Sequence, residues 1–313
     1  MLVFAGCTGT TSSKKNGYSL DGAFNGGNTA ITMEFTEGQP PAKIRDGGLQ
    51  PFTIRAMITN KGEYDIPQGE GHVVLSGISY DDFNVDEASV ELPALRGVKK
   101  QGTNTISGAI QPIMFSNLKY LPQLPSGVHT QKIYMDICYP YQTSALISMC
   151  VSGSTLQSFD SDLKVCDVEG TRKYANSGAP VIVENVKQTP AGTSSVMIQF
   201  DIVHKKTSGN GRVYKSGSLD SYCKVYGKSV SSTDADVYEN YVKFEVNTGI
   251  DGIDCSGTGS NKGEVFLSNG KTTVYCTQDT SNQEDYERPV NVVLNYDYFD
   301  RISKDVQIEH ISQ

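Results

Sequence analysis

Apolar and polar residues alternate with a period of two in several segments of this chain, and this period constrains the fold more than any other feature. In residues 52–59 every second side chain is apolar, and the side chains between them are mostly polar. Residues 196–202 and 242–246 have a similar alternation. Because successive side chains of a strand point to opposite faces, each segment is predicted to be a half-buried antiparallel strand. The chain is therefore expected to be all-β.

A two-residue turn supports the same fold class. Asn269-Gly270 separates two strand-like segments, residues 265–268 and 271–275, and Asn-Gly favours the positive φ angles of a type I′ hairpin turn. The composition agrees, since the chain has 31 Gly and 17 Tyr but no Trp. Such usage suits many short strands joined by turns. No run of about 18 apolar residues occurs, so no membrane-spanning helix is predicted.

Two distant segments repeat each other. Residues 133–141 and 290–298 both alternate apolar residues with other residues and both end in Tyr-x-Tyr. The segments that begin each half also agree, since residues 31–59 and 181–204 each contain an apolar strand, a proline and a second strand. Such self-similarity indicates two copies of one structural unit.

The repeat and the length of 313 residues predict two tandem Ig-like antiparallel β-sandwich domains. The chain is accordingly divided into residues 1–29, a signal remnant with a flexible tether; residues 30–152, the first Ig-like domain; residues 153–178, a connector; and residues 179–313, the second Ig-like domain.

The first seven residues form an apolar segment that ends in two small residues and a cysteine, Ala5-Gly6-Cys7. This pattern resembles a lipobox, in which the cysteine thiol accepts a thioether-linked lipid, although Phe4 stands where Leu is usual. The polar and small residues from Thr8 to Gly27 predict a flexible tether. Cys7 is therefore the expected lipid anchor to a membrane. The alternative is an ordinary buried N-terminal strand with one free cysteine.

Six cysteines remain once Cys7 is set aside, and an even number fits three disulfides in an oxidising compartment. They are Cys138, Cys150, Cys166, Cys223, Cys255 and Cys276. Their positions about two expected hairpins favour the pairs Cys138–Cys150 and Cys255–Cys276, which leaves Cys166–Cys223, although six cysteines allow many pairings. No Cys-x-x-Cys pair occurs, so a structural metal is not expected. Buried free thiols in a cytosolic protein are the alternative.

Three segments, residues 37–41, 52–65 and 137–143, contain a Pro-Pro entry, a strand that ends in Asn-Lys-Gly, and a Tyr-rich hairpin. Together they resemble the tandem Ig-like domains, of the CARDB or NEW3 sort, of exported or lipid-anchored archaeal surface proteins. The resemblance implies an adhesion-type module at the cell surface. It implies no catalytic residues.

Motifs of common enzymes are missing from the sequence. No Gly-x-Ser-x-Gly, His-Glu-x-x-His or dinucleotide-binding glycine motif is present. Acidic clusters at residues 81–87 and 160–169 are interpreted as solvated loops, with calcium binding as the alternative. A net charge of −8 disfavours binding to nucleic acid. The four histidines are isolated in the sequence: His72, His129, His204 and His310. We therefore expect no enzymatic activity, no cofactor and no metal.

The two Tyr-x-Tyr segments, residues 139–141 and 296–298, could form a binding patch, but their equivalence in the repeat favours a shared structural role. The sequence thus predicts a non-enzymatic, lipid-anchored cell-surface protein for structure or adhesion, with protein partners bound or assembled through exposed edge strands. The alternative is a structural subunit of a virion or extracellular filament, which the absence of N-glycosylation sequons favours.

Overall fold

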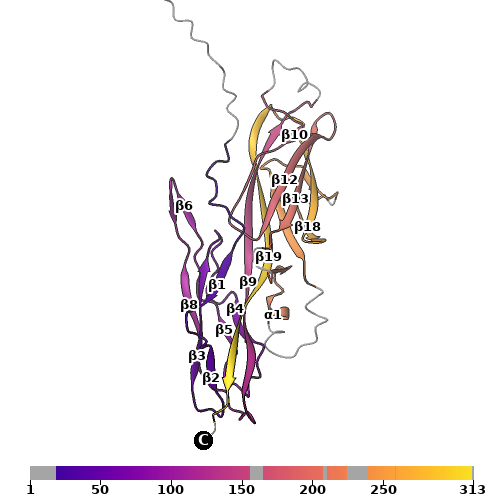
Figure 1. The fold of residues 1–313 in the computed structure, drawn as a ribbon. Coiled ribbons are helices and arrows are strands. Elements are labelled where there is room, and N and C mark those ends of the chain that lie inside the picture. The colour runs from indigo at the N-terminus through magenta and orange to yellow at the C-terminus, as the bar shows by residue number, and fades with distance from the viewer. Residues whose placement is uncertain (1–18, 156–164, 207–209, 224–237, 258, 312–313) are drawn as a thin grey trace, which may run out of the picture.

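The computed structural model describes residues 19–155, 165–206, 210–223, 238–257 and 259–311. The predicted anchor Cys7 and part of the acidic cluster at residues 160–169 lie outside these ranges. The fold is all-β and almost entirely antiparallel, as the alternation predicts (Figure 1). In the described ranges, no helix is long and apolar enough to cross a membrane.

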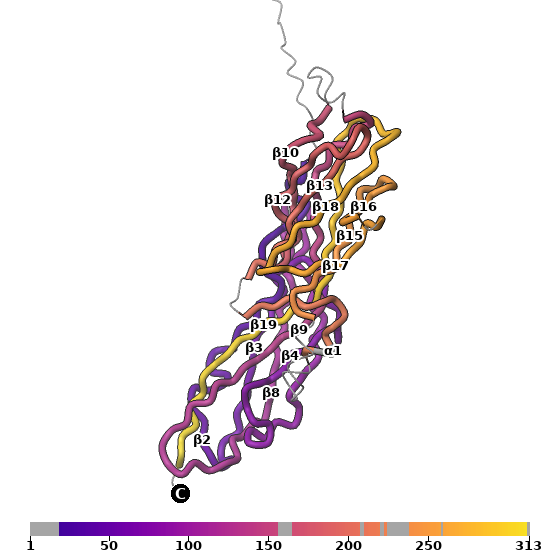
Figure 2. The backbone as a smooth tube through the Cα atoms, turned by 90° about the vertical axis from the view of Figure 1, so that its right-hand side faces the viewer, coloured from indigo at the N-terminus to yellow at the C-terminus, as the bar shows by residue number. Residues whose placement is uncertain are grey.

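Two long strands form the spine of the molecule. β9 (Val128–Val151) and β19 (Tyr286–Glu309) each contain 24 residues and pair antiparallel along their whole length. At the usual rise of an antiparallel strand, each is about 80 Å long. Figure 2 shows both strands running from one end of the molecule to the other. The two copies of the sequence repeat are these two strands, so Tyr139 lies opposite Tyr298 and Tyr141 opposite Tyr296.

The spine belongs to a nine-stranded sheet, in which seven shorter strands join β9 and β19. Its main path is β17 (Lys262–Phe266), β15 (Tyr241–Asn247), β19, β9, β4 (His72–Ser76) and β5 (Ser89–Glu91). Three further strands pair with the spine outside this path: β11 (Tyr174–Asn176) with β9, and β14 (Arg212–Lys215) and β2 (Lys43–Arg45) with β19.

Two smaller sheets lie beside the spine (Figure 1). The first has the order β1 (Ile31–Phe35), β3 (Phe52–Asn60), β8 (Ile110–Leu118). The second has the order β10 (Gly170–Thr171), β12 (Val181–Pro190), β13 (Ser195–His204), β18 (Lys271–Asp279), β16 (Ile253–Cys255). A ribbon of β6 (Lys99–Gln101) and β7 (Asn104–Ile106) and a short helix, α1 (Leu219–Tyr222), complete the elements.

One continuous apolar core lies between the spine and the two smaller sheets. The odd-numbered residues of β9 from Ile133 to Val151 are all buried. Their apolar members belong to the same cluster as Ile54 of β3 and Phe200 of β13. The period of two thus gives the long strand one buried face along its length.

The hydrogen bonding does not follow the predicted boundary between residues 30–152 and 179–313. The last three residues of β19 pair with β2, and the same end of β19 pairs with the start of β9. Segments from both predicted domains therefore share one part of the sheet. The repeat has this outcome because its two copies are strands that pair with each other, so each strand is part of both halves of the molecule.

The structure pairs the six cysteines as Cys138–Cys223, Cys150–Cys166 and Cys255–Cys276. The expected pairs Cys138–Cys150 and Cys166–Cys223 are wrong. The expected hairpin between Cys138 and Cys150 is absent, since both lie on β9 and are separated by about 40 Å of extended chain. The chain stays extended between the two cysteines because this part of β9 pairs with β19 without a break.

Candidate functional site

Edge strands are candidate binding sites, because their outer backbone groups have no hydrogen-bond partner in the sheet. Most edge strands here are short or charged. β5 and β2 have three residues each, and β17 contains Lys262 and Glu264. β8 differs, since it has nine residues and none is charged. It lies on the left-hand side of the molecule in Figure 1.

The hydrogen bonding of β3 shows which groups of β8 face outward. The Asn60 N–H donates to the Ala109 carbonyl at 3.0 Å, so the backbone N–H and C=O groups of the even-numbered residues of β3 point toward β8. Backbone groups alternate in direction along a strand. With the observed register, the N–H groups of Ile110 and Met114 and the C=O groups of Ile110, Pro112 and Met114 therefore point to the free edge. In the part of the chain that the structure describes, β8 has β3 as its one strand neighbour.

The side chains of the same three residues form an apolar strip on the outer face of the sheet. Ile110 and Met114 are 58% and 55% exposed, whereas Ile113 and Phe115, which point inward, are 6% and 5% exposed. Pro112 is also exposed, and it pairs with the half-buried Met57 of β3. We call Ile110, Pro112 and Met114, with their free backbone edge, the β8 strip.

Pro112 fits this strand because of its position. A proline has no N–H to donate, and sheets tolerate it where that N–H would face solvent. Residue 112 is such a position, so β8 keeps its hydrogen bonds to β3. The free edge still offers the N–H groups of Ile110 and Met114 and the carbonyls of all three residues.

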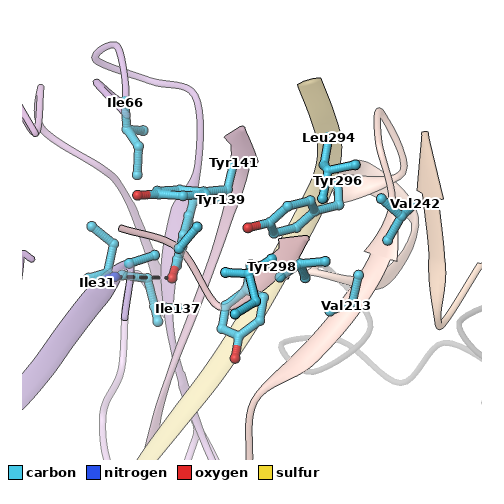
Figure 3. Packing of buried hydrophobic residues seen from close by; sticks show 14 of the residues in the cluster. Ile31, Ile66, Ile137, Tyr139, Tyr141, Val213, Val242, Leu294, Tyr296 and Tyr298 are labelled. Atoms are coloured by element: carbon cyan, nitrogen blue, oxygen red, sulfur yellow. Dashed lines mark hydrogen bonds between the residues drawn. The ribbon is translucent and has the colours of Figure 1, made fainter. Parts of the chain in front are cut away.

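The predicted Tyr-x-Tyr segments lie in the core rather than on a surface. Tyr139, Tyr141, Tyr296 and Tyr298 are at most 3% exposed (Figure 3). The Tyr139 hydroxyl accepts the Ile31 N–H at 3.4 Å, and the Tyr141 hydroxyl donates to a backbone carbonyl at 2.7 Å. Burial raises the pKa of Tyr139 well above its ordinary value. These side chains join the spine to its neighbours.

His204 is buried at the edge of this tyrosine cluster. Its Nε2 lies 3.2 Å from the Tyr298 hydroxyl, and its Nδ1 is buried with no hydrogen-bond partner among the described residues. Burial lowers the pKa of His204 to about 4. His310 lies apart from it and bonds Asp46 at 2.7 Å. The described residues contain no group of three or more His, Cys, Asp or Glu side chains that could hold a metal ion.

Asp297 is a buried carboxylate on the opposite face of β19 from Tyr296 and Tyr298. It accepts the Ser218 N–H at 2.8 Å, and its Oδ1 has no hydrogen-bond partner in the described chain. Burial raises the pKa of Asp297 to about 6. This burial could not be predicted from the sequence, because an Asp between two tyrosines of a strand is expected to face water.

The acidic cluster at residues 81–87 is exposed: Asp81, Asp82, Asp86 and Glu87 all face solvent.

The β8 strip was not predicted from the sequence, although the sequence contains a signal for it. Between Lys100 and Lys119 the sequence contains no charged residue, in a chain that is 20% charged. Such a segment around a strand pattern marks an edge without charge protection.

Comparisons with known proteins identify no relative that informs this site. No protein-family model and no curated protein matches the chain. Among solved structures, it has a match to the secreted serine protease VesC from Vibrio cholerae, at 12% sequence identity and a TM-score of 0.19. The match covers 85% of this chain and 50% of that chain, so this chain spans about half the length of the protease. A similarity at this TM-score carries no argument about fold or activity.

Proposed function

We propose that this protein is an exported, non-enzymatic surface protein that is held to a membrane by a lipid on Cys7 and acts by binding protein chains. Three disulfides suggest an oxidising, extracellular environment. The small residues before Cys7 support a covalent anchor.

The observation that carries the proposal is the β8 strip. A nine-residue strand with a free edge and no charge is a template for an added strand. Backbone hydrogen bonds to such an edge supply affinity, and exposed side chains such as Ile110 and Met114 supply specificity. An adhesion or assembly role uses this kind of surface and requires no catalytic group.

We also propose that each half of the spine, with the smaller sheet beside it, corresponds to an Ig-like sandwich of the CARDB or NEW3 sort. The antiparallel sheets and their shared apolar core support this assignment. Because both halves use β9 and β19, the two sandwiches would act as one stiff unit.

Glu63 supports the idea that the anchor holds the body in a defined orientation. Its carboxylate accepts the N–H groups of Asn25 at 2.9 Å, Gly26 at 3.0 Å and Gly178 at 2.7 Å. These bonds join the last residues of the predicted tether, Asn25 and Gly26, to the body of the protein. Charge-assisted bonds of this kind are stronger than neutral ones.

The anchor and the location are tested by fractionating cells that express the full chain or its Cys7→Ser variant. We expect the native chain in the membrane fraction, with an intact mass that includes a lipid on Cys7, and accessible to protease added outside the cell. The Cys7→Ser variant should leave the membrane fraction. A native chain with a free Cys7 thiol and an unprocessed Met1 would contradict the proposal.

The same strip also favours the second candidate, a structural subunit of a virion or extracellular filament, because repeated strand addition builds arrays. Electron microscopy of native material distinguishes the two candidates. Regular particles or fibres that contain the chain would favour the subunit, and single copies in membrane vesicles would favour the surface protein.

A further inference from the structure

We propose that two adjoining crevices beside the N-terminal segment bind an acidic oligosaccharide, one whose sugar rings carry carboxylates. The crevices have aromatic side chains in their lining, unpaired cations, and walls that hydrogen bonds hold in place, and each feature fits such a ligand. This ligand is additional to the protein partners proposed above, and it is tested separately.

Residues 19–26 form one wall of both crevices. Figure 1 draws this segment in indigo between the ribbon of β6 and β7 and the upper half of β9, and the Thr105 hydroxyl of β7 donates to the Asn25 side chain at 3.3 Å. The first crevice has a volume of about 370 Å³ and extends to β9. The second has a volume of about 530 Å³ and extends to β11. Phe24 borders both, so one ligand chain can occupy the two together.

Aromatic rings and small polar groups line the crevices together. Phe24 and Tyr64 are half-buried and line the first crevice, and Tyr174, which is 39% exposed, lines the second. Gln142 and Ser144 add an amide and a hydroxyl to the first. A sugar ring packs its C–H face against an aromatic ring and bonds its hydroxyls to polar groups around that ring. The lining therefore fits a saccharide better than a purely apolar ligand.

The charges of the first crevice leave one cation free. The Glu63 carboxylate already accepts three backbone N–H groups, and Asp65 pairs with the Lys99 ammonium at 2.9 Å. Lys100 in this crevice and Lys173 in the second form no ion pair with any described residue. A free ammonium group next to hydroxyl and amide groups is a binding partner for the carboxylate of an acidic sugar.

Two further charged side chains line the second crevice. Arg172 is largely buried and donates to the Asp167 carbonyl. Asp21 is exposed and accepts the Ser19 hydroxyl at 3.1 Å. Because Asp21 repels an acidic ligand, its removal should act in the opposite direction to removal of a lysine.

The walls of the first crevice are fixed before a ligand binds. The bonds of Glu63 hold Asn25 and Gly26, next to Phe24, against the body of the protein. The Tyr64 ring packs edge-on against the buried Tyr141 ring, with 5.4 Å between the centroids. A preformed site loses less conformational freedom on binding, which favours affinity.

Isothermal titration calorimetry of the oxidised full chain tests the proposal. The probes are oligosaccharides of galacturonate, of mannuronate and of hyaluronan, and the methyl ester of each, which has the same rings without the charge. We expect at least one of the acids to bind one-to-one. Its methyl ester should bind about tenfold more weakly or worse, because the ester cannot pair with an ammonium group.

Substitutions then locate the site. Lys100→Gln and Lys173→Gln should each raise the Kd of the acidic oligosaccharide about tenfold, whereas Asp21→Asn should lower it. Phe24→Leu keeps an apolar side chain but removes the ring that borders both crevices, so it should raise the Kd of the acid and of its ester. Lys132→Gln, at an exposed lysine of β9 that lines neither crevice, is the control and should leave the Kd unchanged. Circular dichroism and thermal unfolding check that each variant retains the fold.

Three outcomes would overturn the proposal. One is that none of the acidic oligosaccharides binds. Another is binding that the two lysine variants and Phe24→Leu leave unchanged, which would place it elsewhere on the protein. The last is single-stranded DNA of matched charge binding as tightly as the acidic oligosaccharide, which would indicate a general surface for polyanions.

Discussion

Protonation of buried His204 should destabilise the fold as the pH falls. Its pKa is lowered from the ordinary value of 6.5 to about 4 in the folded protein. Above pH 6.5 the ring is neutral in both the folded and the unfolded chain. Between these two values the unfolded chain binds a proton that the folded chain does not bind, so the free energy of unfolding decreases as the pH falls. Below the folded pKa the loss is complete.

The size of the effect follows from the pKa shift. The shift of His204 corresponds to a loss of about 3 kcal/mol in the free energy of unfolding. Asp297 acts in the opposite direction, because burial raises its pKa from 3.8 to about 6. The folded chain binds the extra proton in that range, so stability rises by about 3 kcal/mol as the pH falls. The two effects largely cancel in the native protein between about pH 4 and pH 6.

Single substitutions should reveal each effect. Asp297→Asn removes the stabilisation that protonation of Asp297 supplies at low pH. The free energy of unfolding of this variant should therefore fall by about 3 kcal/mol relative to the native chain between about pH 7 and pH 4. In His204→Gln the difference should have the opposite sign. Thr130→Ala is the control, since Thr130 is an exposed residue of β9 whose side chain does not titrate.

The assay is urea unfolding of the oxidised protein, followed by circular dichroism at a series of pH values. The difference in unfolding free energy between each variant and the native chain is plotted against pH. Flat differences for both variants, or slopes with the same sign, would refute the reasoning from burial of these two groups.

Three further predictions concern stability and the N-terminal segment. Asp136 is fully buried and accepts both Nε and Nη2 of Arg301, at 2.5 and 2.8 Å, so Asp136→Asn should cost about 3 kcal/mol in urea unfolding, and a neutral result would contradict the pair's role. Replacing both cysteines of the Cys138–Cys223 disulfide, which spans 85 residues, should lower stability by about 4 kcal/mol in thermal unfolding, because the unfolded chain gains freedom. Glu63→Gln should weaken the hold on the N-terminal segment by about 1 kcal/mol and speed hydrogen exchange there several-fold, whereas unchanged exchange would show that the carboxylate does not hold the segment.

Local features were determined by the sequence alone. The alternation in residues 52–59 and 242–246 corresponds to β3 and β15. The Asn269-Gly270 turn is present, with positive φ at both residues. These features depend on side-chain period and turn chemistry within a few neighbouring residues.

Pairing was decided only by the tertiary structure. The strands on the two sides of the Asn269-Gly270 turn belong to different sheets and share a single bridge, Ser268 with Lys271. The repeat was visible in the sequence. That its two copies pair with each other as one long spine was not visible, and this pairing determines which cysteines lie close enough to form disulfides. The free edge of β8 likewise depends on the tertiary structure, because the edge is free only where no other described strand pairs with β8. Partners are chosen by burial between segments far apart in the chain, and no local pattern records that choice.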